Sequence, residues 1–340
     1  MIVTGGTHTA GVPTSAFAME PGMAIRYDQP APALSASLTG YTVYHAASTE
    51  PRTDWFLPAP AMICTTVDAG PLTIQIGARV VAPPPGPFLI GPSSAVQRTT
   101  THGGSMVGIG LSAAGWARLT HRRASDLHNH VVPLSAVIEA PLAHRLGDAL
   151  AAAPDDRAVK SLLDAILPDL LAREHTDDPA IHALMAAVVT DGLIDVCDVA
   201  ERLVLEPFAL RRLSLRYFGM PTKLLLRRAR FLRSLLAMLS NEGRIDRARI
   251  DSSYHDMSHF LRDSHAFLGT TPRRFLAQAT PFLIASLRAR AAVLGAATQA
   301  LHGAAMPLTM PDAAASHAAA DCPPISRRRR SAPTSVARGR

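Results

Sequence analysis

The sequence predicts an α+β protein of two domains, a β-rich domain followed by a domain made of helices. The chain has 340 residues, whereas a single domain has roughly 100–200 residues. Short apolar segments separated by Gly and Pro fill residues 41–111, which is the pattern of an antiparallel sandwich or barrel. From Ser112 onward the apolar residues recur at helical spacing instead.

The parts of the chain follow one another in a simple order. Residues 1–35 are rich in Gly, Pro, Ser and Thr, and we expect them to be disordered. The β-rich domain is predicted at residues 36–135, and linker helices are predicted at 136–189. A helical domain is predicted at 190–278. We expect residues 279–340 to form a helix and a disordered basic tail.

Positive charge is concentrated in two segments. Residues 201–250 contain 12 Arg or Lys against 4 Asp or Glu, a net +8, and residues 321–340 carry a net +5. The whole chain is +7, so the remaining residues carry −6. Such a distribution indicates an acidic partner, with nucleic acid as the first candidate.

Several classes of protein are not indicated by the sequence. No apolar run reaches the ~18 residues that span a bilayer, and Cys64, Cys197 and Cys322 form no Cys-x-x-Cys motif. We expect no secretory signal, because no Lys or Arg precedes Arg26 and no apolar h-region follows. We therefore expect a cytoplasmic protein without a membrane span.

The sequence contains no recognisable catalytic motif, so we expect no enzyme, no catalytic residue and no cofactor. The histidines of the N-terminal half are His102, His121, His128 and His130. His128 and His130 have the spacing of paired metal ligands, but no third ligand stands at a suitable distance. We expect no metal site, and ordinary surface and core histidines are the preferred interpretation. The aromatic residues of this half either line a small-molecule pocket or form its core.

A weak internal repeat with an offset of fifty residues lies in the helical domain. The aligned pairs are Glu206 and Asp256, Leu210 and Phe260, Arg212 and Arg262, Ser214 and Ser264, Phe218 and Leu268, Gly219 and Gly269, and Leu225 and Phe275. Each copy is predicted to contain a short helix, a turn and a second helix that ends at Gly, which is a helix-turn-helix. The short helices are predicted at 196–203 and 246–252, and the second helices at 207–218 and 256–268.

One long helix is predicted between the two copies, over residues 223–239. Leucines supply its apolar positions, and its charged positions are Arg227, Arg228, Arg230 and Arg233. Such a helix is a rod of roughly 25 Å, which would place the two recognition helices about one turn of DNA, ~34 Å, apart.

Six segments of the helical domain match the pattern of a known family. They are Asp198–Leu203, Leu210–Leu213, Phe218-Gly219, Leu225–Leu232, Tyr254–Asp263 and Leu268–Phe275. On these segments, residues 190–278 resemble the DNA-binding domain of the AraC/XylS family of transcription regulators. The resemblance covers about a quarter of the chain, and its second half is the more specific part.

The resemblance implies a sequence-specific transcription regulator. Its N-terminal half would be a cupin-like or sandwich domain that binds a small-molecule effector or a second copy of the chain. The implied partners are double-stranded DNA and, if the protein activates transcription, RNA polymerase. Two other functions remain open: a metal-dependent β-barrel enzyme fused to a helix-turn-helix domain, and a decayed regulator that acts as a protein-interaction module.

The resemblance also implies roles for individual residues. The base-reading residues would be Phe208, Arg211 and Arg212 in the first copy and Ser258, His259 and Arg262 in the second. The phosphate-binding residues would be Thr222, Lys223, Arg227, Arg273 and Arg274. For Arg212 and Arg262 the alternative is a solvated helix surface or an internal salt bridge, and for Phe208 it is a place in the core.

The chain departs from the family pattern at several positions. Ser214 and Ser264 stand where the family usually has Phe, Ser253 stands where it has Gly, and Arg249 where it has Ala. Pro221-Thr222 also reverses the usual order. Loss of a buried Phe costs ~3–5 kcal/mol if the space stays empty. We expect neighbouring aromatic residues to fill it, and the candidates are Phe208, Tyr217, Phe231 and Phe267.

Overall fold

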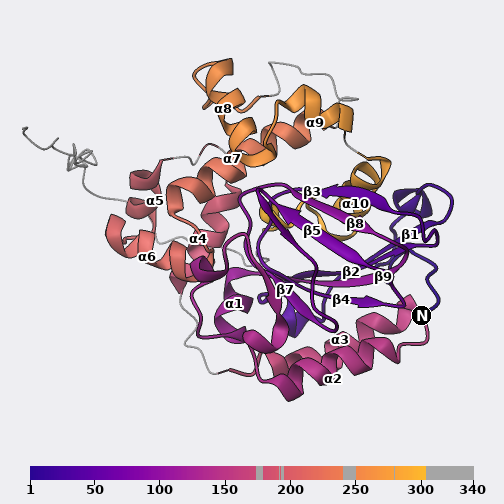
Figure 1. Ribbon diagram of the computed structural model, residues 1–340. Helices are drawn as coiled ribbons and strands as arrows, with labels where there is room; N and C mark the ends of the chain where they lie inside the picture. Colours follow the sequence, from indigo (N-terminus) through magenta and orange to yellow (C-terminus); the bar gives the residue numbers. More distant parts are fainter. Residues whose placement is uncertain (174–178, 191, 193–194, 240–249, 279, 304–340) are drawn as a thin grey trace, which may run out of the picture. The chain divides into compact units, whose positions relative to one another are not determined.

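The computed structural model describes residues 1–340 except 174–178, 191, 193–194, 240–249, 279 and 304–340. The chain divides into a compact unit, Met1–Ala305, and a second unit, Met306–Arg340, which lies entirely outside the described residues. In the first unit every strand except the last, Val131–Pro133, comes before the α-helices (Figure 1). The predicted fold class, a β-rich N-terminal region and a helical C-terminal region, is therefore confirmed. The predicted basic tail lies outside the described residues.

Two antiparallel sheets form the β-rich region in the described part of the chain. The larger sheet has the strand order β1-β2-β9-β4-β7-β10, and the smaller has the order β3-β8-β5-β6. The strands are β1 (Met23–Asp28), β2 (Leu38–Ala46), β3 (Arg52–Phe56), β4 (Met62–Val67), β5 (Leu72–Ile76), β6 (Arg79–Val81), β7 (Phe88–Ile90), β8 (Gln97–Thr101), β9 (Gly104–Leu111) and β10 (Val131–Pro133).

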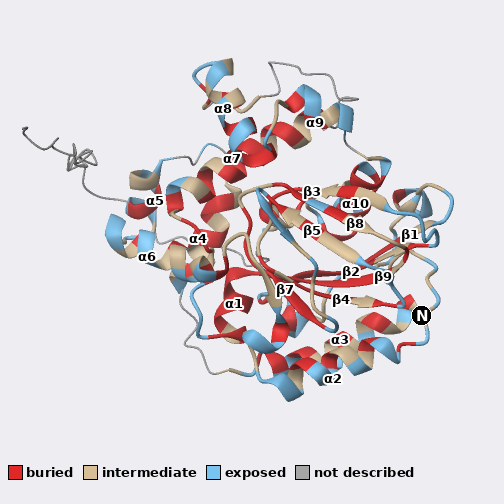
Figure 2. Ribbon diagram, viewed as in Figure 1, coloured by how far each residue is buried: buried red, intermediate tan, exposed pale blue. Residues whose placement is uncertain are grey.

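The core of this region lies against the larger sheet. In β2 and β9 the residue pairs Tyr41–Ile109 and Val43–Val107 face each other across the ladder, and all four are buried. Figure 2 shows β2, β4 and β9 buried along most of their length. The same core includes Trp116 of helix α1.

Helices cover the core from the other side. They are α1 (Ala113–Leu119), α2 (Ala140–Ala151) and α3 (Asp156–Leu170). Helix α4 (Pro179–Val189) packs instead against α1, α6 (Pro207–Tyr217) and α7 (Thr222–Leu239). The first turn of α3 is fixed by its N-cap, because the Asp155 carboxylate accepts the Ala158 N–H at 2.9 Å. Leu146 and Leu150 of α2 and Leu163 of α3 enter the sheet core, so these helices bury the strand face that would otherwise meet water. Short 3-10 turns complete the region: Thr14–Phe17, Pro32–Leu34, Ala124–Leu127 and Leu134–Ala136.

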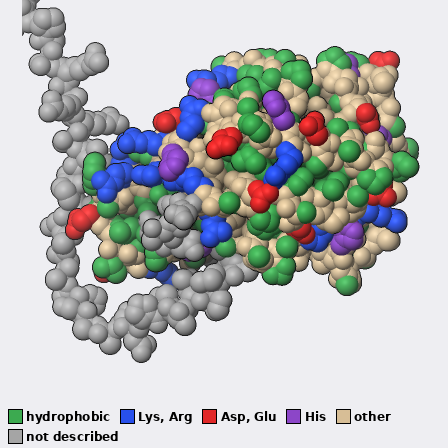
Figure 3. All heavy atoms as spheres, turned by 90° about the horizontal axis from the view of Figure 1, so that it is seen from below, with side chains coloured by type: hydrophobic (Ala, Val, Ile, Leu, Met, Phe, Trp, Pro, Cys, Tyr) green, Lys and Arg blue, Asp and Glu red, His purple; other side chains and the backbone are tan. Residues whose placement is uncertain are grey.

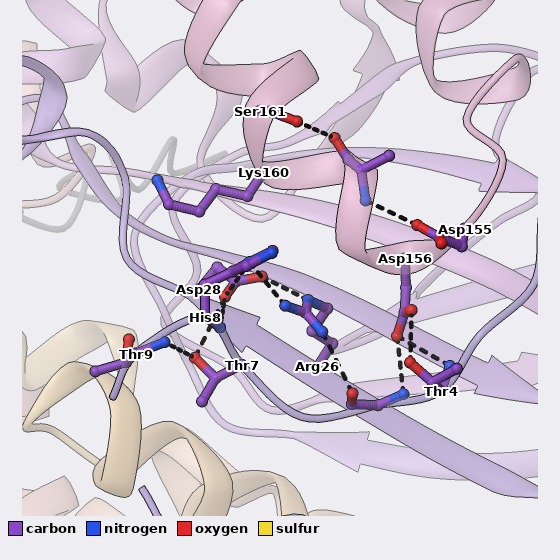
Figure 4. Close-up of polar contacts among 12 residues, drawn as sticks. Thr4, Thr7, His8, Thr9, Arg26, Asp28, Asp155, Asp156, Lys160 and Ser161 are labelled. Carbon is purple, nitrogen blue, oxygen red and sulfur yellow. Dashed lines mark hydrogen bonds and ion pairs between the residues drawn. The ribbon is translucent and has the colours of Figure 1, made fainter. Parts of the chain in front are cut away.

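The expectation that residues 1–35 are disordered is wrong. They contain strand β1, and buried aspartates hold the segment before it (Figure 4). The Asp156 carboxylate accepts the N–H groups of Thr4 and Gly5 at 3.1 and 2.8 Å. Asp28 accepts the N–H of His8 at 2.6 Å and pairs with Arg26. A Gly- and Thr-rich segment is ordered here because its backbone donors meet fixed acceptors.

The helical region contains α5 (Val196–Arg202), α6 (Pro207–Tyr217), α7 (Thr222–Leu239), α8 (Met257–Leu268), α9 (Pro272–Gln278) and α10 (Pro281–Leu294), followed by a 3-10 turn at Gln299–Leu301. Helix α10 is the helix predicted after residue 279. It returns to the β-rich region, where Ala289, Val293 and Leu294 share a small core with Ile25 and Tyr27 of β1 (Figure 1).

The β-rich and helical regions share contacts within the first unit. Leu57 and Val96, from loops beside the smaller sheet, enter the core around Phe231 of α7. The Val96 N–H donates to the Phe267 carbonyl of α8 at 2.7 Å. Among the described residues, no helix combines the length and the apolar character needed to cross a membrane.

Candidate nucleic-acid interface

The first helix-turn-helix consists of α5, a turn and α6. Asp195 caps α5 by accepting the Cys197 N–H at 2.7 Å, and Pro207 opens α6, where its missing N–H costs nothing. The turn closes when the Leu205 N–H donates to the Ala200 carbonyl at 2.9 Å. Val204 in this turn has φ +52°, a left-handed conformation that a β-branched residue rarely adopts.

Helix α6 presents the residues predicted to read bases in the first copy. Phe208, Arg211 and Arg212 are all exposed, and their spacing places them on one side of the helix. Phe208 is 72% exposed, so the alternative that it fills the core is wrong. Among the described residues no ion pair joins Arg211 or Arg212 to an acidic group. Lys and Arg side chains gather at the end of the molecule that holds α5 and α6 (Figure 3).

The second copy is described from residue 250 onward, and its predicted first helix at 246–252 lies largely outside the described residues. Its second helix, α8, begins at Asp256, whose carboxylate accepts the His259 N–H at 2.7 Å. It ends at Gly269 with φ +71°, which glycine adopts at little cost. Asp256 is thus the N-cap of α8, and Gly269, the predicted end of the helix, is its C-cap.

Helix α8 exposes Ser258 and Arg262 and holds His259 half-buried. Arg262 Nε donates to the Ser258 carbonyl of its own helix at 3.3 Å. The His259 ring lies 5.3 Å from the Tyr254 ring. Burial and the neighbouring Arg230 lower the pKa of His259, so the ring is neutral at pH 7.

The long helix α7 contacts both α6 and α8 (Figure 1), as the repeat predicts. Its arginines do not form the solvent-exposed face expected for them. Arg228 and Arg230 are 3% and 5% exposed, and Arg227 and Arg233 are half-buried. The arginines stand at the charged positions of the helix as the sequence indicates, but other parts of the chain cover this side.

Asp263 of α8 forms ion pairs with two of these arginines, Arg227 and Arg230. Its buried carboxylate accepts from Arg227 Nε at 3.1 Å, from Arg230 Nη2 at 3.1 Å and from the Tyr254 hydroxyl at 2.9 Å. The Arg230 guanidinium also lies 4.0 Å from the centre of the Tyr254 ring. Burial alone raises the pKa of Asp263, but the hydrogen bonds from Arg227 and Tyr254 outweigh it and hold the pKa below 3.8. This ionised cluster fixes α8 on α7.

Arg228 connects α7 to the β-rich region. Its Nη1 donates to the carbonyls of Ala59 and Ser93 at 3.2 and 2.8 Å. Burial lowers the pKa of Arg228 to about 10, so the side chain is still charged at pH 7. The helix between the two copies is therefore attached to the β-rich region by a charged hydrogen bond.

The residues predicted to bind phosphate fall into two groups. Lys223 at the start of α7 and Arg273 and Arg274 at the start of α9 are exposed. Thr222 is buried, and its hydroxyl faces the Leu210 carbonyl at 3.5 Å. Arg227 is engaged by Asp263. Only the three exposed cations are placed to meet a phosphate.

Ser214 and Ser264, which stand where the family usually has Phe, are each held by a hydrogen bond. Both are fully buried, and each hydroxyl donates at 2.7 Å to the carbonyl six residues later, that of Met220 or Thr270. The sequence pattern does not show these hydrogen bonds. It does place the two serines at equivalent positions, because the internal repeat aligns Ser214 with Ser264. Phe231 and Phe267, two of the residues expected to fill the space, are buried with their ring centres 5.4 Å apart.

The four histidines of the β-rich region have different neighbours. His102 contacts the Pro71 carbonyl, His121 contacts Arg173, His130 contacts Arg79, and His128 is partly buried. Within the described residues, no three His, Cys, Asp or Glu side chains are grouped so that they could hold a metal ion.

Comparison with known proteins gives matches at the level of structure only. No protein-family profile matches the chain, and no curated protein sequence matches it. A structure of ToxT from Vibrio cholerae is 13% identical and covers 71% of this chain and 98% of that chain, with a TM-score of 0.40. A ToxT structure with bound unsaturated fatty acid, from Vibrio cholerae strain SCE256, is 12% identical and covers 77% of this chain and 98% of that chain, also with a TM-score of 0.40.

A further likeness is to the AraC-like transcriptional activator CuxR. It is 12% identical and covers 63% of this chain and 87% of that chain, with a TM-score of 0.24.

Proposed function

We propose that this protein is a DNA-binding transcription regulator of the AraC/XylS type that reads two adjacent major grooves with α6 and α8. One observation carries the proposal: Arg212 and Arg262 occupy equivalent positions in the two copies of the repeat, and both are exposed. A guanidinium fork matches the O6 and N7 acceptors of guanine in the major groove. The alternative interpretation is an internal salt bridge, but no acidic group of the described residues pairs with Arg212 or Arg262.

The neighbours of these arginines suit the same role. In α6, Arg211 and Phe208 extend the exposed surface beside Arg212, and an exposed aromatic ring fits a thymine methyl or a sugar. In α8, Ser258 lies one turn before Arg262 and is also exposed.

The backbone of DNA would be held at two helix starts. Lys223 at the start of α7 and Arg273 and Arg274 at the start of α9 are exposed cations, and the unpaired N–H groups of a helix N-terminus also attract phosphate. Thr222 and Arg227 are left out of this proposal because their side chains are occupied inside the protein. These contacts orient the protein and carry no sequence preference.

The β-rich region would supply the control of DNA binding. It contacts α7 through Arg228 and α8 through Val96, so a change in this region reaches both helices directly. An effector regulates DNA binding only to the extent that it prefers one arrangement over another. Dimerisation and contact with RNA polymerase belong to the same proposal.

The test is selection of binding sites from random DNA with the full-length protein, followed by single substitutions. Arg212→Ala and Arg262→Ala should each relax the preference at a different base pair, by about 1–3 kcal/mol or roughly 5- to 150-fold. Arg145→Ala is the matched control, because this half-exposed arginine pairs with Asp169 on the linker helices. Equal, sequence-blind weakening in both variants would instead support the decayed regulator, and absence of any selected motif would reject the proposal.

A further inference from the structure

A depression beside α6 is lined by arginines from two regions of the molecule. Its volume is about 530 Å³, and its walls come from α6, from the turn before α6 and from the start of α4. No Asp or Glu of the described residues lines it. The cations that line it are Arg211, Arg212 and Arg216 of α6 and Arg123, which precedes the 3-10 turn Ala124–Leu127 of the β-rich region.

A fixed stretch of backbone holds Arg123 beside α6. The Trp116 indole N–H donates to the Arg122 carbonyl at 2.9 Å, and the Asp126 N–H donates to the Arg123 carbonyl at 3.0 Å. The 3-10 turn that follows contacts α6, as does α1 (Figure 1). The backbone of Arg123 is therefore positioned before any partner binds, while its exposed side chain lines the depression.

Arg123 and Arg216 are cations that no acidic group of the described residues neutralises. Both side chains are exposed, and no ion pair joins either of them to an Asp or Glu in the described part of the chain. A recess lined by charges of one sign concentrates the electric field and attracts a partner of the opposite sign. This surface is therefore suited to a polyanion.

The dimensions of B-DNA indicate which part of the polyanion meets these two cations. The major groove is about 12 Å wide and a helix with its side chains is about 10–12 Å across, so a helix in the groove has a phosphate strand along each flank. The bases are contacted by the N-terminal residues of such a helix. Arg216 lies in the last turn of α6, one turn after Arg212, which places it past the base-reading part of the helix.

We infer that the β-rich region takes part in DNA binding directly, because Arg123 and Arg216 hold one phosphate strand of the duplex that α6 reads. The inference rests on the proposed function, which places the duplex on α6. Each guanidinium would donate charge-assisted hydrogen bonds to phosphate oxygens. One strand then bridges the β-rich region and α6, so the two keep their present contact in the DNA complex.

The experiment measures the affinity of the full-length protein for its selected DNA site at several salt concentrations, with Arg123→Gln and Arg216→Gln as variants. One phosphate contact contributes about −0.9 to the slope of log affinity against log salt, so by counterion release alone its loss should weaken binding about 5-fold at roughly 0.15 M salt and about 15-fold at roughly 0.05 M. The loss should be the same for every DNA sequence, because a phosphate contact carries no sequence information. Arg123→Lys should retain most of the affinity, since an ammonium group also neutralises a phosphate.

The matched control is Arg122→Gln, which should leave the slope unchanged. Arg122 is the neighbour of Arg123 in the chain and is also exposed. Its Nη1 donates to the Ala136 carbonyl at 3.1 Å, and it does not line the depression.

Neutral phosphate analogues locate the contact on the DNA. A methylphosphonate replaces one charged phosphate oxygen by a methyl group, and it is placed in turn at each phosphate near the base pair at which Arg212→Ala relaxes the preference. At one or two positions it should weaken binding of the native protein and have no further effect on Arg123→Gln, because that variant has already lost the contact.

The outcomes separate this inference from the proposed function. An unchanged slope for Arg123→Gln, a loss that varies with DNA sequence, or a loss equal to that of Arg122→Gln overturns the inference. If Arg212→Ala relaxes the base preference while Arg123→Gln leaves the slope unchanged, only the inference is rejected. If no motif is selected, the proposed function fails, and a shallower slope for Arg123→Gln on random-sequence duplex still places the β-rich region in the DNA interface.

Discussion

Replacing Asp263 by Asn tests whether an ionised cluster holds α8 on α7. The substitution keeps the size of the side chain and removes its charge. In the native protein this buried carboxylate accepts from Arg227, Arg230 and Tyr254. After the substitution, Arg230, which is 6% exposed at its side chain, remains buried without an anion.

The expected loss of stability follows from these contacts. Removing one partner of a buried ion pair costs about 3–5 kcal/mol. The Asn oxygen can still accept one hydrogen bond, and Arg227 is 35% exposed, so solvent screens its share. We therefore expect the free energy of unfolding to fall by about 3 kcal/mol, the lower end of the range.

The assay is urea unfolding of the two proteins followed by circular dichroism. The midpoint should fall while the dependence on urea stays the same. Asp169→Asn is the control, because Asp169 is 61% exposed in its pair with Arg145 and should change stability by less than about 1 kcal/mol. A loss for Asp263→Asn no larger than that of the control would refute the reasoning.

The stability of the native protein and of Asp263→Asn can also be compared as a function of pH. The folded pKa of Asp263 lies below 3.8, so its charge stabilises the fold above that pH. The contribution is lost as the pH falls through the folded pKa. The advantage of the native protein over Asp263→Asn should therefore be constant from pH 5 to 7, roughly, and shrink below about pH 4. An advantage that grows on acidification contradicts the assigned direction.

Four further substitutions follow from local geometry and can be measured by thermal or urea unfolding. Ser214→Ala and Ser264→Ala should each cost about 1 kcal/mol, because each removes one buried hydrogen bond to a carbonyl; clearly unequal losses would contradict the equivalence of the two turns. Val204→Asn should stabilise by about 1 kcal/mol, because Val204 is 90% exposed and held at φ +52°. Gly40→Ala should cost about 2 kcal/mol, since Gly40 has φ +137° and a Cβ there would lie 2.4 Å from Leu294 of α10.

The parts of the fold that depend on neighbours in sequence could be predicted. Gly269 ends α8 and Asp256 begins it, because capping needs only residues within a few positions. The repeat made Ser214 and Ser264 equivalent, and the structure gives them equivalent bonds. Periodicity also separated the β-rich region from the helices at Ser112, which caps α1.

The parts that depend on distant residues could not be predicted. Arg228 has the spacing of a solvent-facing residue, but its acceptors Ala59 and Ser93 lie more than a hundred residues earlier. The order of Thr4 and Gly5 depends in the same way on Asp156. Local composition reports which side chains are polar, and it does not report which polar face another region covers.

The burial of the α7 arginines changes what the charge of this region means. Residues 201–250 carry a net +8, which by itself suggests many phosphate contacts. Arg227 and Arg230 share the single carboxylate of Asp263, and Arg228 donates to carbonyls of the β-rich region. Much of the charge on α7 thus holds the protein together and is not available to DNA.

The salt dependence of DNA binding measures how many of these cations contact phosphate and how many are held inside the protein. Each phosphate contact contributes a slope of about −0.9 to the plot of log affinity against log salt. Lys223→Gln, Arg273→Gln and Arg274→Gln should each make the slope shallower by about 1. Arg228→Gln should leave it unchanged, because the slope, unlike the affinity, does not depend on the fraction of folded protein. A shallower slope for Arg228→Gln would show that α7 meets the DNA backbone, and α7 would then have to leave the β-rich region when DNA binds.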